Sequence, residues 1–334
     1  MNYIDNVYVI NMDKSTDRIK NMGKNVPIMG KPFTRVSAIV GKELSKKDLQ
    51  DYTSESCQLF CTPSMIGCYL SHKKTWETMI TNNDKYALIM EDDCELIDTF
   101  QEDLKMVLDE LIVRDPDFDF IYLGCMGMCD PDKNYNAIAY LQGLFMSHFD
   151  TNKKQISNTY SFIPEAPIGF HCYIISQKCA KQIVKSMNKA NHHVDVDFVN
   201  YAVNKELHVY ASKKQLGYQF TNSMTSTQTS AFPVILNKLT EPIKCKKNIS
   251  YSYYMSAPVI GVFGYNINLY LIILLLITLC IPLEYIKTYI SIIVIYLSIE
   301  LLMDYKNYDY ILLWSVFIVI ALTIKNKLGS KALS

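Results

Sequence analysis

The chain lacks an excess of charge of either sign and is poor in arginine. Its 334 residues include 33 Lys and Arg against 33 Asp and Glu, and arginine stands at only three positions. A neutral chain of this kind is not expected to bind nucleic acid through a basic surface. Hydrophobic residues make up 49% of the sequence, so the chain can bury a sizeable core and is not disordered as a whole.

The sequence also lacks a secretory leader pattern, an internal repeat, a low-complexity tract and a glycine-rich phosphate loop. Its first residues lead straight into the apolar run 7–10, so we expect the front part of the chain to stay in the cytosol. The ten cysteines fit this expectation as free, mostly buried thiols. Two pairs share one spacing, Cys57 with Cys61 and Cys125 with Cys129, but without a C-x2-C pair we favour core packing over zinc.

Charge is distributed unevenly along the chain. Residues 1–255 hold 57 of the 66 charged residues, and residues 256–334 hold the other nine. The back part contains three apolar runs at 259–283, 286–303 and 310–324. A helix that crosses a bilayer needs roughly 20 apolar residues. Three such runs in succession favour two or three transmembrane helices over a buried helical core.

This pattern divides the chain into a front domain at 1–230, a linker at 231–258, a membrane region at 259–325 and a short basic tail at 326–334. Lysines flank the membrane region on both sides, and the positive-inside bias would place both flanks in the cytosol. That arrangement needs an even number of crossings, so two and three crossings both stay open. In either case we expect a multi-pass membrane protein whose front domain faces the cytosol.

Apolar strands alternate with helices in the front domain, which predicts an α/β fold with a mainly parallel sheet. Residue 64 is expected to cap the helix that follows it. The expected strands lie at 7–10, 33–38, 87–90, 118–124 and 168–176, and the expected helices start near residue 15 and cover 63–80, 99–113 and 177–187. Residues 125–165 hold few regular signals and are expected to form loops or a hairpin.

One expected strand runs directly into three carboxylates, Glu91-Asp92-Asp93. Acidic groups crowded at the end of a buried strand repel one another, and a divalent cation removes this penalty. Oxygen ligands suit Mg²⁺ or Mn²⁺. Because residues i and i+2 of an extended segment face the same side, Glu91 and Asp93 can share one ion while Asp92 points elsewhere. The alternative is a solvated acidic turn in which Asp92 or Asp93 caps a helix.

Four sequence blocks, in this order, resemble glycosyltransferase family 25, the group of lipopolysaccharide-type sugar transferases and procollagen galactosyltransferases. They span about half the chain, and their order and spacing make the resemblance specific. The blocks are VYVINMDKSTDR at 7–18, IGCYLSHKKTW at 66–76, YALIMEDD at 86–93 and GFHCYIIS at 169–176.

The resemblance implies a GT-A-like nucleotide-sugar transferase fold, metal-assisted inverting transfer, and a UDP-hexose donor carrying galactose or glucose. It implies Mn²⁺ or Mg²⁺ held by Glu91 and Asp93, and a glycan, lipid-linked or protein hydroxyl as acceptor. The chain departs from the family pattern at 39–41, where an acidic residue and glycine are usual, and at His171-Cys172, which leaves acceptor contacts open. A late family segment is only loosely matched by 215–226.

Several polar residues are candidates for binding the donor. Arg18 suits a diphosphate, although a surface salt bridge to Asp17 or Asp13 is the alternative. Asn11 and Asp13 could contact the base or ribose, or could cap a turn. Asp92 completes the predicted donor-binding set.

Two histidines are further candidates. His72 could hydrogen-bond phosphate or the donor sugar, or could be a satisfied core histidine. His171 is the predicted acceptor contact. In the same block as His72, Gly67 is expected to permit close helix packing.

Inverting transfer needs a general base that deprotonates the acceptor hydroxyl. We predict Asp195 as first choice and Asp197 as second, although either could cap a helix that starts near residue 198. His192 or His193 with Asp195, or else His208, could instead supply a ligand on the far side of the metal.

Two other functions compete with a glycosyltransferase. A nucleotidyl or phosphosugar transferase would use a similar acidic cluster, but would often carry the phosphate loop that is missing here. A non-catalytic membrane scaffold with a degenerate transferase domain would not need to keep the acidic cluster and Arg18 intact.

Overall fold

The computed structural model describes residues 3–151, 159–219, 232–240, 242–243, 251–256, 258–262, 265–303 and 308–331. The chain separates into two compact units, Met1–Phe220 and Thr221–Ser334. The predicted end of the front domain at residue 230 falls outside the described residues and stays a prediction. Part of the predicted linker 231–258, and most of the loosely matched segment 215–226, also lie outside the described residues.

A mixed seven-stranded sheet forms the centre of the first unit, in the order β2-β1-β3-β7-β5-β8-β6 over the described residues. Its strands are β1 Asn6–Asn11, β2 Thr34–Ser37, β3 Tyr86–Glu91, β5 Phe120–Met128, β6 Ser161–Phe162, β7 Ala166–Ser176 and β8 Val209–Ser212. The pairs β1–β2, β1–β3 and β5–β8 are parallel, whereas β7 runs antiparallel to both β3 and β5. The expectation of a mainly parallel sheet holds only around β1 and for β5–β8.

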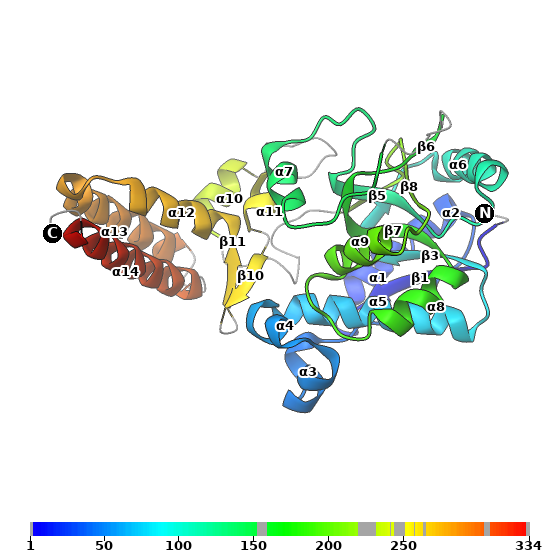
Figure 1. Cartoon of the computed structure of the whole chain (residues 1–334), viewed down its shortest axis with the longest axis horizontal. Coiled ribbons are helices and arrows are strands. Elements are labelled where there is room, and N and C mark those ends of the chain that lie inside the picture. Colours follow the sequence, from blue (N-terminus) through cyan, green and yellow to red (C-terminus); the bar gives the residue numbers. More distant parts are fainter. Residues whose placement is uncertain are drawn as a thin grey trace. The chain divides into compact units, whose positions relative to one another are not determined.

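Helices cover both faces of this sheet (Figure 1). The helices are α1 Thr16–Met22, α2 Asn25–Met29, α3 Lys46–Tyr52, α4 Glu55–Phe60, α5 Pro63–Thr81, α6 Phe100–Arg114, α7 Ala137–Gly143, α8 Gln177–Ser186 and α9 Val194–Asn204. Helices α5, α8 and α9 share one hydrophobic core with the sheet, and α1, α2 and α6 share the other. A short pair of strands, β4 Cys94–Leu96 and β9 Gly217–Gln219, lies outside the main sheet.

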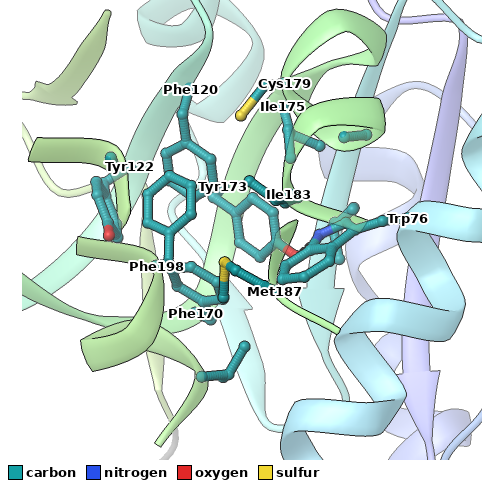
Figure 2. Packing of buried hydrophobic residues seen from close by; sticks show 14 of the residues in the cluster. Trp76, Phe120, Tyr122, Phe170, Tyr173, Ile175, Cys179, Ile183, Met187 and Phe198 are labelled. Atoms are coloured by element: carbon teal, nitrogen blue, oxygen red, sulfur yellow. Dashed lines mark hydrogen bonds between the residues drawn. The ribbon is translucent and has the colours of Figure 1, made fainter. Parts of the chain in front are cut away.

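Alternation along the strands divides the side chains between the two cores. In β3, Ala87 and Ile89 pack with α5, α8 and α9, whereas Leu88 and Met90 pack on the opposite face. Aromatic rings fill the first core, as Figure 2 shows around Phe120, Phe170 and Tyr173. The same alternation of side chains determines which residues at the ends of the strands point toward α5.

Helix α5 begins one residue before the expected cap. Thr62, not Ser64, stands at the N-cap, where its side chain accepts a hydrogen bond from the backbone of Met65. Gly67 permits close packing, as predicted. A Cβ at this position would lie 2.6 Å from the carbonyl oxygen of Ile39 and 2.8 Å from the backbone nitrogen of Gly41.

Two further expectations differ from the structure. The region 125–165 continues β5 to Met128 and contains α7 and β6, so it is more regular than predicted. Helix α9 starts at Val194, because His193 has the extended backbone of an N-cap residue. Asp195 and Asp197 therefore lie inside its first turn and do not precede it.

Four cysteines are not free thiols, contrary to expectation. Cys57 is bonded to Cys61 and Cys125 to Cys129, each pair being four residues apart. In both pairs the chain leaves a regular element between the two cysteines, α4 in the first and β5 in the second, and this brings the sulfurs together. Cys68, Cys94, Cys172, Cys179 and Cys280 are free among the described cysteines.

The second unit does not contain a single helix over 259–283. A hairpin of β10 Pro258–Val262 and β11 Tyr265–Asn268 comes first, where glycine and asparagine interrupt the apolar run. The other elements are α10 Val234–Thr240, α11 Tyr251–Ser256, α12 Leu269–Cys280, α13 Ile286–Met303 and α14 Tyr308–Lys331. The predicted tail thus begins within α14.

One of these helices has the length and composition of a membrane span. Within the described residues only α13 qualifies, with 18 residues, and 11% of its apolar window is buried. At 1.5 Å per residue, α12 would extend about 18 Å, less than the roughly 30 Å of a bilayer core. The structure thus supports one candidate span and leaves the prediction of two or three crossings open.

Candidate active site

The predicted site residues gather at the carboxyl ends of β1 and β3. These strands run in parallel, and Ile10 of β1 is paired with Glu91 of β3. Asn11 and the acidic turn 92–93 therefore leave the same edge of the sheet side by side. Ligands of open α/β sheets bind at this edge.

Asp92 is fixed from both sides at this edge. The side chain of Asn11 donates to Asp92 Oδ2 at 2.7 Å, and Arg18 Nη1 donates to Asp92 Oδ1 at 2.8 Å. Burial opposes charge on Arg18, but Asp93 and Asp92 hold the pKa of the guanidinium above its usual range. The structure thus brings together three of the predicted donor-binding residues, with Arg18 bonded to the acidic turn.

Asp93 is the least satisfied carboxylate of the cluster. Its Oδ2 lies 3.6 Å from Arg18 Nη1 and accepts a long hydrogen bond of 3.4 Å from Gln219 of β9. Its Oδ1 is buried and has no hydrogen-bond partner among the described residues. Burial, reinforced by the nearby Glu91 charge and opposed by Arg18, raises the pKa of Asp93 to about 7. A cation would satisfy this oxygen and favour its charged form.

Glu91 hydrogen-bonds on the α5 side of the turn, and its charge also acts on Asp93. The expected alternation ends at Glu91, because residues 92 and 93 form a turn before β4. Glu91 Oε1 instead lies 3.1 Å from His72 Nε2 and 3.8 Å from the Cys68 sulfur. Burial favours the neutral acid, yet His72, with His171 and His193, lowers the pKa of the Glu91 carboxyl. That Glu91 and Asp93 share one ion stays a prediction.

His72 connects this edge to the aromatic core. Its Nδ1 lies 2.9 Å from the hydroxyl of Tyr173, which accepts a second hydrogen bond of 2.9 Å from Trp76 Nε1. Figure 2 shows the indole of Trp76 directed at the Tyr173 oxygen. Burial disfavours the imidazolium, but Cys68 and Glu91 raise the pKa of His72 to about 9. His72 is therefore both buried and bonded to a site residue, so the two alternatives for this residue are compatible.

Arg35 of β2 organises the end of β1, and sequence reasoning missed it. Arg35 Nε donates to Asn11 Oδ1 at 2.7 Å, and Arg35 Nη2 is bonded to Asp13. Ser37 also donates to Asp13 Oδ1 at 2.9 Å. The hydrogen bonds from Arg35 and Ser37 lower the pKa of Asp13. Asp13 is thereby tied to β2, whereas Asn11 faces Asp92.

The two predicted bases accept hydrogen bonds from the chain itself. Asp195 accepts bonds from the backbone of Gly169 and Val196 and pairs with His193 Nδ1 at 2.7 Å. Burial opposes ionisation of Asp195, but His193 and these backbone groups lower its pKa, which weakens it as a base.

Asp197 is held in a similar way. It accepts bonds from the backbone of Asn191 and His192 and pairs with His192 Nδ1 at 2.8 Å. Both carboxylates thus order the start of α9, and their role as base stays a prediction.

The remaining histidines lie in different places. His171 is buried beside β9, with Nε2 at 3.3 Å from the Gly217 carbonyl oxygen. Asp195 and Cys68 outweigh burial and raise the pKa of His193, and His193 in turn helps to lower the pKa of Glu91. His208 precedes β8 at the opposite edge of the sheet, where it pairs with Asp115. The structure therefore brings His193, but not His208, to the acidic turn.

The sequence model of the family described as glycosyltransferase family 25 (LPS biosynthesis protein) matches residues 4–199, which carry almost all of this site. The chain belongs to glycosyltransferase family 25. A "Glycosyltransferase 25 family member" of Anopheles gambiae is 29% identical over 140 residues, covering 40% of this chain and 24% of that protein. "Procollagen galactosyltransferase 1-A" of Xenopus laevis is 30% identical over 128 residues, covering 36% of this chain and 21% of that protein.

Not every family 25 relative is described as active. A mouse protein named "Inactive glycosyltransferase 25 family member 3" is 25% identical over 153 residues, covering 43% of this chain and 26% of that protein. The matched region spans about a quarter of the length of these curated relatives. Family membership therefore identifies the transferase domain, and activity must be argued from the site.

Proposed function

We propose that this chain is an active glycosyltransferase that moves a hexose, galactose or glucose, from a UDP-sugar to a hydroxyl acceptor with inversion. The acceptor would be a glycan, a lipid-linked sugar or a protein side chain. Membership of family 25 and the names of the galactosyltransferase relatives support the reaction class. One observation supports catalytic activity most directly. In an acidic turn whose other groups are hydrogen-bonded, Asp93 Oδ1 is buried and has no hydrogen-bond partner among the described residues.

That oxygen fits a divalent cation. Asp93 would hold Mn²⁺ or Mg²⁺ through Oδ1, together with a carboxylate oxygen of Glu91, and oxygen donors are what these ions prefer. When bound, the cation would neutralise the diphosphate that leaves with the nucleotide. The set of oxygen donors therefore supports a metal-dependent transferase more than a scaffold, which gains nothing from an unsatisfied buried carboxylate.

The chain's own residues would bind and orient the substrates around this point. Arg18 would attract the diphosphate while Asp92 holds its guanidinium in place. Asn11 and Asp13 would contact the base or ribose from the end of β1. His171 would lie on the acceptor side, and Asp195 is the first candidate for the base that takes the acceptor proton.

We also propose that the second unit attaches the enzyme to a membrane. Helix α13 supports this, because large apolar side chains such as Ile292, Ile295 and Leu302 are 61%, 62% and 87% exposed. The expected free cysteines were one argument for a front domain that faces the cytosol. The two disulfides in this domain remove that argument, because disulfides persist mainly in oxidising compartments.

Donor hydrolysis tests the proposed reaction. The detergent-solubilised full chain is incubated with a panel of UDP-, GDP- and CMP-sugars, with Mn²⁺ or with EDTA, and released nucleotide is measured. We expect metal-dependent release from one UDP-hexose, lost in Asp93→Asn. Asp17→Asn, which changes an exposed aspartate one residue from Arg18, is the matched control. No release from any donor, together with no nucleotide-induced shift in melting temperature, would refute the proposal and place the chain with the non-catalytic members.

A further inference from the structure

Metal-ligating side chains of three kinds meet around Cys68, on the α5 side of the acidic turn. The ligand atoms of Cys68, His72 and Glu91 all lie within 4.8 Å of one another. Asp195 and Cys68 also outweigh burial and raise the pKa of His193, which precedes α9, so His193 lies beside this group. A sulfur, an imidazole and a carboxylate therefore converge from α5 and β3, next to a second imidazole at the start of α9.

The arrangement follows from local geometry. Cys68 and His72 are four residues apart, so they lie on one face of α5, one turn from each other. Glu91 has the strand parity of Ala87 and Ile89, which pack against α5. His72 is fully buried and Cys68 and Glu91 are partly buried, so water competes poorly for their ligand atoms.

Both histidines are oriented by a second partner. Tyr173 binds Nδ1 of His72 and leaves Nε2 directed at Glu91. Asp195 binds Nδ1 of His193 and is itself fixed by the backbone of Gly169 and Val196. Such an arrangement is typical of metal-binding histidines, whose other ring nitrogen is bonded to a carboxylate, hydroxyl or carbonyl group. In this group Asp195 is a positioning residue for His193.

We propose that Cys68, His72, Glu91 and His193 bind a zinc ion. A mixed set of one thiolate, two imidazoles and one carboxylate is a four-coordinate zinc set, whereas Mg²⁺ and Mn²⁺ favour oxygen ligands alone. On binding, the Cys68 thiol and the zinc-facing ring nitrogens of His72 and His193 release their protons to solvent. His72 would bond zinc through Nε2 while its Nδ1–H donates to the Tyr173 oxygen.

This site adjoins the cation of the proposed reaction and shares Glu91 with it. Glu91 would contribute Oε1 to zinc, and its other oxygen, with Asp93, would remain for the catalytic cation. Zinc would join α5, the end of β3 and the start of α9, and so fix the acidic turn relative to Asp195. The inference does not depend on the transferase activity, because its test measures metal content and spectra.

The test uses the full chain, stripped of metal and reloaded with zinc or cobalt. We expect one zinc ion per chain after removal of excess metal, and a thiolate-to-cobalt charge-transfer band for the cobalt form. Cys68→Ser and His193→Gln should lose the bound zinc, and Cys68→Ser should also lose the band. His192→Gln, one residue away and 60% exposed at its side chain, and Cys280→Ser, an exposed cysteine, should keep both.

Unfolding of a variant is distinguished by melting temperature in EDTA. If it is folded, Cys68→Ser should have the same melting temperature in EDTA as the metal-free wild type. Zinc should raise the melting temperature of the wild type only. A wild type that retains no zinc after loading, or a charge-transfer band that persists in Cys68→Ser, would overturn the proposal. Asp93→Asn should keep zinc while losing Mn²⁺-dependent hydrolysis, so the two proposals can fail independently.

Discussion

Two buried tyrosines of neighbouring strands should respond in opposite ways to the loss of their hydroxyl groups. Tyr173 binds Trp76 Nε1 and His72 Nδ1, both at 2.9 Å. The hydroxyl of Tyr122 is buried and has no hydrogen-bond partner in the part of the chain that the structure describes. Both side chains belong to the same aromatic core (Figure 2), so they differ chiefly in what their hydroxyls bond.

Removing one partner of a buried hydrogen bond costs about 1–3 kcal/mol for each group left unsatisfied. Tyr173→Phe leaves two such groups, Trp76 Nε1 and His72 Nδ1, so we expect a loss of roughly 2–6 kcal/mol of unfolding free energy. Tyr122→Phe removes a hydroxyl that had gained nothing from burial, so we expect it to be neutral or stabilising.

Urea unfolding of the detergent-solubilised full chain measures the difference. Trp76 fluorescence is followed in a Trp314→Phe background, which is common to all samples and leaves one tryptophan. With a urea dependence of about 3 kcal/mol per molar, Tyr173→Phe should lower the midpoint by roughly 1–2 M. Equal losses in the two variants would refute the reasoning, because ring packing and not the hydroxyl bonds would then explain the cost.

Three further predictions concern residues of the first unit. Gly67→Ala should destabilise the chain by about 1–3 kcal/mol in the same urea assay, because the added Cβ meets backbone atoms of 39–41; an unchanged midpoint would show that α5 can move away. Arg35→Lys cannot bond Asn11 as a guanidinium does, so donor affinity should fall roughly tenfold by calorimetry; unchanged affinity would remove the end of β1 from the donor site. Glu110 accepts hydrogen bonds from the Ser161 side chain and from the backbone of residues 159–161, and these outweigh burial and lower its pKa. Its stabilisation is therefore present above the usual pKa of a glutamate and lost as the pH falls through the folded pKa. Glu110→Gln should cost about 1–3 kcal/mol at neutral pH, with the gap to wild type closing in acid; a gap independent of pH would contradict the assignment.

Much of the fold could be predicted because it depends on local patterns. The apolar strand before Glu91 and the helix that begins at Pro63 lie where their apolar periodicity places them. The reversed direction of β7 could not be predicted, because Ala166–Ser176 has the same apolar pattern whichever way it enters the sheet.

The site was predicted as a set of residues more fully than as a set of contacts. Motif blocks pointed to Arg18, His72 and the acidic turn, and the structure brings all of them to one edge. Gln219, which binds Asp93, and His193, which lies beside Cys68, come from distant parts of the sequence. No local sequence pattern predicts these contacts. The turn at Asp92–Asp93 also breaks the alternation on which the shared ion of Glu91 and Asp93 was predicted.

The antiparallel strand β7 divides the sheet edge at the carboxyl ends of β1 and β3 into two parts. The two parts differ in how far their sequence can change without shifting the sheet. Glu91 and Asn11 stand at the ends of strands, so their positions depend on the register of the sheet. The stretch 129–165 connects the end of β5 to the start of β7 at this same edge. Insertions or deletions there would reshape the surroundings of Gly169 and His171 without shifting β1 or β3. If the donor lies against β1 and β3 and the acceptor near His171, as we propose, a lineage could alter the acceptor while keeping the donor site.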